Sequence, residues 1–515
     1  MHSRKRLSKI SRRSFLVTIG MAAIHPGGFD VSPLYAMAAE GSFESIFWRP
    51  GNAWVGDTIP YCENGVFRIF YLHDWRDPNH HPPGTEWYQV STRDLLHFTD
   101  RGQMIGKGRP GEQDASVATG SILKNQGEYH AFYTGYSRER KENGQPEQGI
   151  CHATGTDLDH WSKSTQAPLF ADTAIYEKDD WRDPFVFWNE ETHEYWMLCA
   201  ARLKDGPPRR RGCTALCVSK DLKSWDARPP FYAPDLYETH ECPDLFHHEG
   251  WWYLIFSEFS DRSVTRYRMS RSLAGPWMTP VDDTFDGRAF YAAKTAYDGR
   301  RRLLFGWIPT RNENKDYAFW NWGGNLGFHE IVFLTDGTLG VKPPEEVRTS
   351  IRKQVPLTPV SPFGHAAFHE GSVELDARKG FASITLGQLP SKWRLEATVR
   401  VSPDTRVWGL ALHADQQLSR GYTIRMEPER SRMSVESYPR PDANSPFMMG
   451  LERPLTLPRN QDVHVTAIGD ADIAVIYVNN QAALTSRMED LQHSHFGVFA
   501  EGGTATFTRL MAFGS

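Results

Sequence analysis

A short motif recurs four times between residues 94 and 277 and constrains the fold more than any other feature of the chain. Three copies share the form Asp-Leu-x-x-aromatic, and a looser fourth copy follows them: Asp94–Phe98, Asp157–Trp161, Asp221–Trp225 and Ser272–Trp277. Their leucines lie 63, 64 and 51 residues apart. A repeat of this kind indicates a chain built from similar supersecondary units.

Each copy of the motif follows a run of residues that is typical of a strand. The four runs, and a fifth after the last copy, are residues 65–72, 127–134, 193–200, 250–256 and 300–308. Gly and Pro interrupt the segments often, and helical periodicity is hard to find. We therefore predict an all-β fold that begins with a five-bladed β-propeller at residues 45–345. Long loops are expected, because about 50–60 residues per repeat exceeds the usual blade.

A second domain is expected beyond the Pro-rich link at residues 356–362. Segments that alternate in the strand period, or that form apolar runs, follow the link: residues 372–376, 394–401, 464–468, 473–478 and 498–510. Asn479-Asn480 is a turn candidate between two of them. The pattern predicts a C-terminal β-sandwich over residues 356–515.

The first 38 residues have the pattern of an export signal. Arg4–Arg13 is basic and contains the twin-arginine sequence Ser11-Arg12-Arg13-Ser14-Phe15-Leu16. Phe15–Ile24 is apolar but short for a bilayer span, and Ala36-Met37-Ala38 offers a cleavage site. We expect a twin-arginine signal peptide and export of the folded protein to the periplasm or the cell exterior. A retained membrane anchor is the alternative.

Charge and cysteine usage exclude several classes of partner. Removal of the six basic residues and one acidic residue in the signal moves the formal net charge from −5 to −10. This balance argues against a nucleic acid or an anionic membrane as partner. Cys213 and Cys217 are expected to be buried thiols, and His240, His247 and His248 have no convincing metal-binding spacing. We expect no metal and no redox cofactor.

Three acids in similar settings are the candidate catalytic residues. They stand in Trp54-Val55-Gly56-Asp57-Thr58, in Trp181-Arg182-Asp183-Pro184, and in Glu241-Cys242-Pro243-Asp244 just ahead of the strand-like run at residues 251–256. Acids near strand ends can converge on one pocket. Glycosidic bond cleavage needs such convergence, because one carboxylic acid protonates the leaving oxygen while another carboxylate meets the developing oxocarbenium ion.

Each candidate also has a structural interpretation. An Asp-Pro pair such as Asp183-Pro184 is often a turn in which the carboxylate caps backbone amides. Asp57 can have the same role, and Glu241 can be a salt-bridged acid at a strand end. Arg209-Arg210-Arg211 is expected to be a solvated loop tip, with binding of an anionic substrate as the alternative. Aromatic residues suit either the sugar site or the blade core: Trp54, Trp87, Trp320 and Trp322.

The motifs around these acids resemble those of glycoside hydrolase family 32, the family of invertases, inulinases and levanases. Trp181-Arg182-Asp183-Pro184 is similar to the family's Arg-Asp-Pro motif, and Glu241–Phe246 is similar to its Glu-Cys-Pro motif. Phe290-Tyr291-Ala292 and Phe305-Gly306-Trp307-Ile308 resemble two further blocks. The resemblance covers about residues 45–345, and the C-terminal part is similar in pattern to the family's sandwich domain.

The resemblance implies a role for each acid. Asp57 would be the nucleophile that forms a covalent glycosyl-enzyme, and Glu241 would be the acid and then the base, with a pKa raised by burial beside Asp57. Asp183 would accept hydrogen bonds from sugar hydroxyls, and Arg182 would help to orient it. Carboxyls about 5–5.5 Å apart would make the enzyme retaining. The remaining substrate-binding residues are expected to be Trp54, Trp87, Ser121 and Trp322.

The chain departs from the family pattern around the sugar site. The family's first block has the form Trp-x-Asn-Asp-Pro-Asn-Gly, whereas here Gly56 replaces the amide and Thr58 replaces the proline. Leu72 stands where the family commonly has a glutamine that faces the sugar, and residues 116–121 match the Phe-Ser-Gly-Ser block only loosely. Substrate identity is therefore a weaker expectation than reaction type.

The expected function is cleavage of β-fructofuranosyl linkages in fructans or sucrose-type sugars by an exported retaining hydrolase. A fructosyltransferase is one alternative, because a sugar hydroxyl can replace water as the acceptor. An arabinofuranosidase-like enzyme on a related propeller is another, and it would invert configuration. A non-catalytic carbohydrate-binding propeller is the alternative outside the enzymes.

Overall fold

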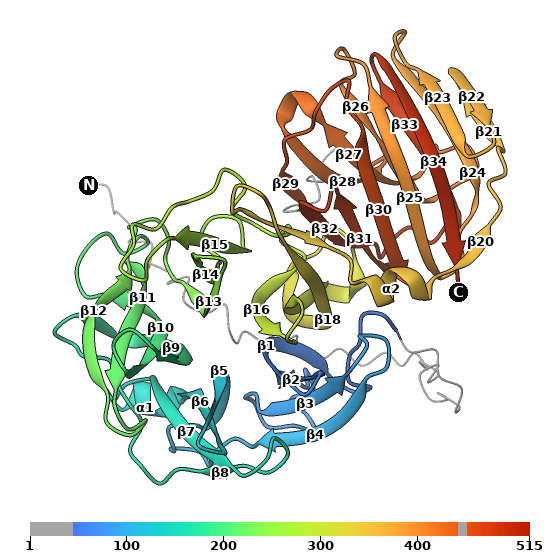
Figure 1. The fold of residues 1–515 in the computed structure, drawn as a ribbon. Coiled ribbons are helices and arrows are strands. Elements are labelled where there is room, and N and C mark those ends of the chain that lie inside the picture. Colours follow the sequence, from blue (N-terminus) through green and yellow to red (C-terminus); the bar gives the residue numbers. More distant parts are fainter. Residues whose placement is uncertain (1–44, 441–450) are drawn as a thin grey trace, which may run out of the picture. The chain divides into compact units, whose positions relative to one another are not determined.

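The computed structural model describes residues 45–440 and 451–515, so the predicted export signal at residues 1–38 lies outside the described residues. The described chain is almost entirely β and contains strands β1 to β34 (Figure 1). Its short helical segments are α1 (Arg138–Glu142), α2 (Glu345–Ser350) and the 3₁₀ turns η1 (Asn312–Asn314) and η2 (Pro428–Arg430). None of the helices in this part of the chain is long and apolar enough to cross a bilayer.

Each of the first three blades has four antiparallel strands, and neighbouring strands follow one another along the chain. Blade 1 comprises β1 (Trp54–Glu63), β2 (Val66–Asp74), β3 (Trp87–Thr92) and β4 (Thr99–Ile105). Blade 2 comprises β5 (Ser116–Asn125), β6 (Glu128–Tyr136), β7 (Gln148–Gly155) and β8 (Ser162–Lys163). Blade 3 comprises β9 (Tyr176–Asn189), β10 (Glu194–Leu203), β11 (Gly212–Ser219) and β12 (Asp226–Tyr232).

The last two blades complete the propeller. Blade 4 comprises β13 (Glu241–His248), β14 (Trp251–Glu258) and β15 (Val264–Ser270). Blade 5 comprises β16 (Tyr291–Tyr297), β17 (Arg302–Arg311), β18 (Trp320–Phe333) and β19 (Leu339–Lys342). Strand β18 also pairs with β1, at Val55 and Gly324, which joins the last blade to the first. Figure 1 shows the first strand of each blade, β1, β5, β9, β13 and β16, nearest to the common centre.

The repeated Asp-Leu-x-x-aromatic motif forms the turn between the third and fourth strands of blades 1 to 3. One carboxylate oxygen in each copy accepts hydrogen bonds from the backbone N–H groups two and three residues later, at 2.8–3.0 Å. In the fourth copy, the Ser272 hydroxyl accepts one such bond from Ala274. These are the local side-chain turns that Asp and Ser favour, and they explain why a copy of the motif recurs in each of blades 1 to 4.

The C-terminal part is a sandwich of two antiparallel sheets. One sheet has the order β22 (His365–His369), β23 (Ser372–Asp376), β34 (Thr504–Gly514), β25 (Lys392–Val401), β30 (Val463–Asp470), β31 (Ile473–Val478) and β32 (Ala482–Arg487), and β20 (Lys353–Val355) pairs with β34. The other has the order β21 (Ser361–Phe363), β24 (Phe381–Gln388), β33 (His495–Glu501), β26 (Val407–Ala414), β27 (Gly421–Glu427), β28 (Arg432–Tyr438) and β29 (Glu452–Pro454).

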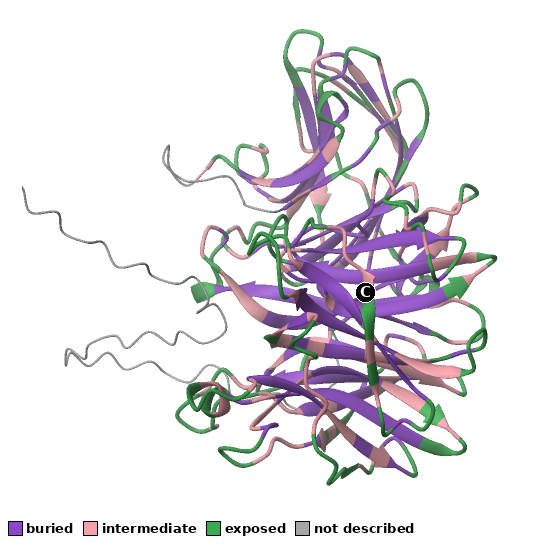
Figure 2. Ribbon diagram, turned by 90° about the vertical axis from the view of Figure 1, so that its left-hand side faces the viewer, coloured by how far each residue is buried: buried purple, intermediate pink, exposed green. Residues whose placement is uncertain are grey.

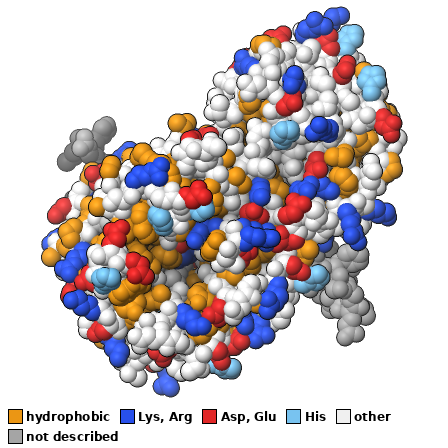
Figure 3. Space-filling model, in the orientation of Figure 1, with side chains coloured by type: hydrophobic (Ala, Val, Ile, Leu, Met, Phe, Trp, Pro, Cys, Tyr) orange, Lys and Arg blue, Asp and Glu red, His pale blue; other side chains and the backbone are white. Residues whose placement is uncertain are grey.

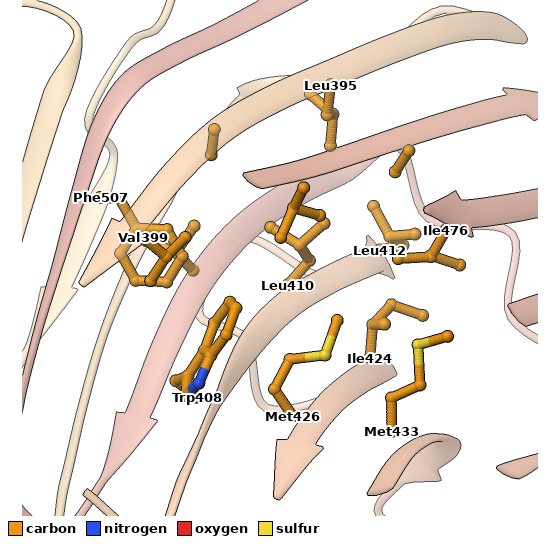
Figure 4. Packing of buried hydrophobic residues seen from close by; sticks show 14 of the residues in the cluster. Leu395, Val399, Trp408, Leu410, Leu412, Ile424, Met426, Met433, Ile476 and Phe507 are labelled. Carbon is orange, nitrogen blue, oxygen red and sulfur yellow. The ribbon is translucent and has the colours of Figure 1, made fainter. Parts of the chain in front are cut away.

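The core of the sandwich lies between its two sheets, because side chains on a strand alternate between the two faces. Leu395 and Val399 of β25 pack with Trp408, Leu410 and Leu412 of β26 in one buried cluster (Figure 4). Figure 2 shows that buried residues follow the strands, whereas exposed residues gather in the connections. The buried free thiols of Cys213 and Cys217 lie in the blade 3 core, as predicted.

Asp286 forms a buried polar junction between the propeller segment and the sandwich segment of the chain. Its carboxylate accepts hydrogen bonds from the backbone N–H and the hydroxyl of Thr485, at 2.7 and 2.5 Å. The ring of His329 bonds to Asp286 through Nε2 (3.0 Å) and to the hydroxyl of Tyr477 through Nδ1 (2.9 Å). Only 3% of Asp286 is exposed, so its loss would leave several buried partners unsatisfied.

We predict that Asp286→Ala lowers the free energy of unfolding by about 3–5 kcal/mol, because it breaks a buried charged network on one side only. Chemical denaturation followed by fluorescence would measure the change. Asp376→Ala is the control, because Asp376 pairs with Arg378 at the surface, where water and salt screen the interaction and little stability depends on it. Equal losses in the two variants would contradict a stabilising role for the junction.

Candidate active site

The first strand of every blade carries a β-bulge at the same point. In blade 1, Val55 pairs with His73 and Thr58 pairs with Tyr71, so two residues of β1 face one residue of β2. The same one-residue shift occurs in the other first strands, after Val117 in β5, Arg182 in β9, Glu241 in β13 and Tyr291 in β16. A bulge bends its strand and re-aims the local side chains. Here the bulges bring together side chains from all five blades.

Asp57 lies in the bulge of β1 and is held by two neighbouring blades. The hydroxyl of Thr119, in the bulge of β5, donates to Oδ2 at 2.6 Å. The indole N–H of Trp307, on β17, donates to Oδ1 at 2.9 Å. Each carboxylate oxygen of Asp57 therefore has one fixed donor, while part of the side chain remains exposed.

Glu241 is the residue just before the bulge of β13. Its Oε1 accepts a hydrogen bond from Nη2 of Arg182 at 3.1 Å, and its Oε2 accepts one from the hydroxyl of Tyr291 at 2.7 Å. The ring of Tyr291 lies 5.4 Å from the ring of Trp307, which donates to Asp57. Two side chains in contact thus connect Glu241 to Asp57.

Asp183 is the buried member of the acid set, with 3% of its surface exposed. Its backbone is in the left-handed region, with φ of 58°, as bulge positions can require. Its N–H donates to Oγ1 of Thr134 at 2.7 Å, and its Oδ2 accepts the backbone N–H of Cys242 at 3.0 Å. Nε of Arg182 lies 3.8 Å from the same oxygen. Arg182 therefore lies between Asp183 and Glu241.

Burial and mutual repulsion set the proton affinities of this cluster. Burial raises the pKa of Asp57 to about 7, with a further contribution from the charge of Asp183, although the hydrogen bonds to Asp57 oppose the shift. Burial also raises the pKa of Glu241, against the opposing charge of Arg182. Two nearby carboxyls whose pKa values are both raised by burial titrate as a coupled pair.

Aromatic and cationic side chains surround this cluster. The ring of Trp322 lies 6.0 Å from that of Trp307, and a Cβ atom at Gly56 would come within 2.1 Å of Trp322. Arg76 stacks 4.9 Å from the ring centre of Trp54 and donates to the carbonyls of Trp322 and the following glycine. Figure 3 shows a hollow near the middle of the propeller, with hydrophobic side chains gathered around much of its rim.

Comparison with known families decides the assignment. Residues 49–343 match the N-terminal domain of glycosyl hydrolases family 32, and residues 369–513 match the C-terminal domain of the same family. The chain belongs to glycosyl hydrolase family 32. The resemblance predicted from the Arg-Asp-Pro and Glu-Cys-Pro motifs is therefore confirmed.

Individual relatives of this family 32 protein agree with the match. A sucrose-6-phosphate hydrolase from Vibrio alginolyticus is 29% identical over 332 residues, which are 61% of this chain and just under two thirds (65%) of that protein. A raffinose invertase from Escherichia coli is 25% identical over 91% of this chain and 97% of its own length. The structure of sucrose-6-phosphate hydrolase from Lactobacillus gasseri superposes with a TM-score of 0.69 at 18% identity, and 91% and 92% of the two chains are covered. The predicted propeller and sandwich fold is confirmed.

The departures from the family pattern have local physical reasons. Gly56 is required because any side chain there would collide with Trp322. The hydroxyl of Thr58 donates to the carbonyl of Phe305 at 2.8 Å, a buried bond between blades 1 and 5 that proline cannot make. Leu72 is 2% exposed and packs in the core between blades 1 and 2, so it provides no polar group to a sugar.

Two predicted substrate-binding residues are buried. Trp87 has no exposed surface, and its indole N–H donates to the carbonyl of Ala118 at 2.9 Å, so its assignment to the sugar site is wrong. Ser121 is 4% exposed, and its Oγ accepts the N–H of Val186 at 3.0 Å, which links blade 2 to blade 3. Ser121 therefore has a structural role between the two blades, and its part in sugar binding stays a prediction.

The acids also lie differently along their strands than expected. Glu241 was expected in the approach to the strand-like run at residues 251–256, but it begins a strand of its own, β13, that pairs with that run. Asp57 and Asp183 lie inside β1 and β9. The bulges account for the difference, because they allow a residue within a strand to point toward the centre.

Three residues that donate hydrogen bonds to the acids are absent from the predicted site. Tyr291 and Trp307 stand in the blocks that resemble the family, so a signal for them was present. Thr119 belongs to the loosely matched segment at residues 116–121, and a threonine in a strand has no distinguishing pattern.

We predict that Asp57→Asn stabilises the protein by roughly 2 kcal/mol or more at pH 8. The folded state binds the Asp57 proton more tightly than the unfolded state, so between pH values of about 4 and 7 the aspartate increasingly destabilises the fold as the pH rises. The amide has no such charge. Urea denaturation at pH 4 and pH 8 would show a gain at pH 8 that nearly disappears at pH 4.

The control for this variant is Asp77→Asn. The side chain of Asp77 is largely accessible to solvent, and its hydrogen bond with His80 lowers its pKa, so its replacement should bring no gain at either pH. A pH-independent gain from Asp57→Asn would contradict the assignment of a raised pKa to Asp57.

Proposed function

We propose that this protein is a retaining glycoside hydrolase that cleaves β-fructofuranosyl linkages in fructans or sucrose-type sugars through a covalent glycosyl-enzyme. The observation that carries the proposal is the presentation of Asp57 and Glu241 by equivalent bulges of β1 and β13. Their pKa values are both raised, so the pair can hold one proton and one negative charge. Those are the two states that the first step of the reaction needs.

In the first step, Glu241 donates its proton to the glycosidic oxygen while the carboxylate of Asp57 attacks the anomeric carbon. The bond from that carbon to the leaving oxygen breaks, and an ester to Asp57 forms. Thr119 and Trp307 fix the two oxygens of Asp57, which orients the nucleophile before attack. Tyr291 and Arg182 hold Glu241 in the same way.

In the second step, the Glu241 carboxylate takes a proton from water as the water oxygen attacks the anomeric carbon. The ester bond breaks, Asp57 leaves as a carboxylate, and Glu241 is again the neutral acid. Asp183 has its Oδ2 fixed by the amide of Cys242, and we assign Oδ1 to a sugar hydroxyl.

The relatives support the substrate class. Family 32 proteins that resemble this chain include the sucrose-6-phosphate hydrolase, the raffinose invertase and a levanbiose-producing levanase from Bacillus subtilis. A fructosyltransferase uses the same first step, with a sugar hydroxyl as acceptor in the second. We further propose that the twin-arginine pattern in residues 1–38 directs export, so that the enzyme meets its carbohydrate outside the cytoplasm.

We predict that Glu241→Gln lowers kcat by about 10²–10⁴-fold, because the amide keeps the volume of the side chain without the transferable proton. Fructose release from sucrose, inulin and levan would measure turnover, and calorimetric titration would show that sugar binding is largely retained. Glu128→Gln, an exposed change on β6, is the control and should keep full activity. Undiminished turnover in Glu241→Gln would rule out the acid/base assignment.

The stereochemistry of transfer tests the role of Asp57. A nucleophilic carboxylate gives two inversions, so hydrolysis of sucrose in the presence of methanol should yield methyl β-fructofuranoside, identified by NMR. An inverting enzyme would give the α product. Release of arabinose from arabinan with inversion would favour the arabinofuranosidase-like alternative instead.

A further inference from the structure

Lys294 is a buried cation beneath the acids that the proposed mechanism does not use. It is the first paired residue after the bulge of β16, opposite Phe305, and only 2% of it is exposed. Its Nζ donates to the carbonyl of Gly120 on β5 at 2.8 Å and lies 5.4 Å from the ring centre of Phe185 on β9. The side chain therefore reaches from blade 5 to blades 2 and 3.

Acidic groups from three blades act electrostatically on this ammonium group. Asp244 and the thiol of Cys242 come from β13, Asp183 from β9 and Asp57 from β1. The thiol of Cys199, on β10, also feels the charge of Lys294. Among the described residues, Lys294 makes no ion pair within 4 Å, so its charge acts on several acids without being neutralised by one.

The carboxyls of the cluster outnumber its cations. Four carboxyls lie in or directly behind the site: Asp57, Asp183, Glu241 and Asp244. Three cations act on them, Arg182, Lys294 and Arg302, the last of which faces Asp244. The cluster therefore contains one carboxyl more than it contains cations, so loss of any one cation would leave buried negative charge uncompensated.

The next acids outward do not change this count. Asp180 and Glu177 pair with Arg202 and Arg211, at 3.3 and 3.0 Å. They form a neutral group of their own, and Arg182 bonds to Asp180 at its edge.

The hydrogen bond from Lys294 also fixes a part of the site. Gly120 follows Thr119, whose hydroxyl donates to Asp57. Gly120 has no room for a side chain, because a Cβ atom would lie 1.9 Å from the carbonyl of Phe132. The bond from Nζ to the Gly120 carbonyl therefore tethers a tightly packed segment that carries a partner of the nucleophile.

We propose that Lys294 is a positioning residue: its bond to Gly120 holds Thr119 against Asp57, and its buried ammonium charge favours the ionised form of the Asp57 nucleophile. The inference rests on the proposed retaining hydrolysis and adds a residue outside the reacting pair. Burial lowers the pKa of Lys294, and the surrounding acids oppose that shift. The cation therefore persists only while these acids are ionised.

The pH dependence of kcat/KM tests this role. Loss of a cation near carboxylates raises their pKa values, so Lys294→Met should move both limbs of the profile on sucrose upward by about one pH unit. It should also lower the maximum of kcat/KM by at least about tenfold. Lys294→Gln removes the charge but keeps a donor for Gly120, so it should show the same shift with a smaller loss at the optimum. Lys124→Met, at an exposed position of β5, is the control and should leave the profile unchanged.

Chemical rescue separates the charge from the volume of the side chain. In a Lys294→Ala variant shown to be folded by near-UV circular dichroism, propylammonium should restore activity and the parent profile, whereas propanol should not. Equal effects of the two additives, or an unshifted profile in Lys294→Met and Lys294→Gln, would overturn the inference. A parent protein without activity on any furanoside would instead overturn the proposed function, and this inference with it.

Discussion

The site depends on one backbone irregularity that occurs in all five blades. Side chains of a regular strand alternate between two faces, so such a strand would present only every second residue toward the centre. The extra residue in each bulge interrupts that alternation at the same position in every first strand. As a result, one cluster can contain residues from different positions relative to the bulge. Glu241 precedes its bulge, Asp57 and Asp183 lie within theirs, and Lys294 follows its own.

The bulges also leave backbone groups without ladder partners, and the site satisfies them. The free N–H of Asp183 donates to Thr134 of blade 2, and the free N–H of Cys242 donates to Asp183 of blade 3. Because buried backbone donors need partners, these bonds stabilise the bulges as well as orient the acids. Each bond crosses from one blade to the next, so the interactions that hold the propeller together and those that build the site are partly the same.

Local patterns in the sequence predict the blades well and their centre only in part. The turn motif marks the edge of blades 1 to 4, because an Asp or Ser side chain forms it without help from distant residues, as at Asp94. Proline marks two of the bulges, at Pro184 and Pro243, because a strand tolerates proline where ladder pairing is interrupted. The other bulges have no such mark. Trp87 shows the remaining difficulty, since an aromatic residue in a strand has the same pattern whether it faces a sugar or a core.

Solvent exposure separates the charged groups that react from those that keep their charge during the reaction. Asp57 and Glu241 are partly exposed, whereas Asp183, Asp244 and Lys294 are between 2% and 3% exposed. Protons can therefore exchange with substrate and water only at the front pair, while the charges behind it remain constant during a reaction. A fixed charge stabilises a changing one without reorganisation, which is the most effective arrangement for electrostatic catalysis. The fold provides this division before any sugar binds.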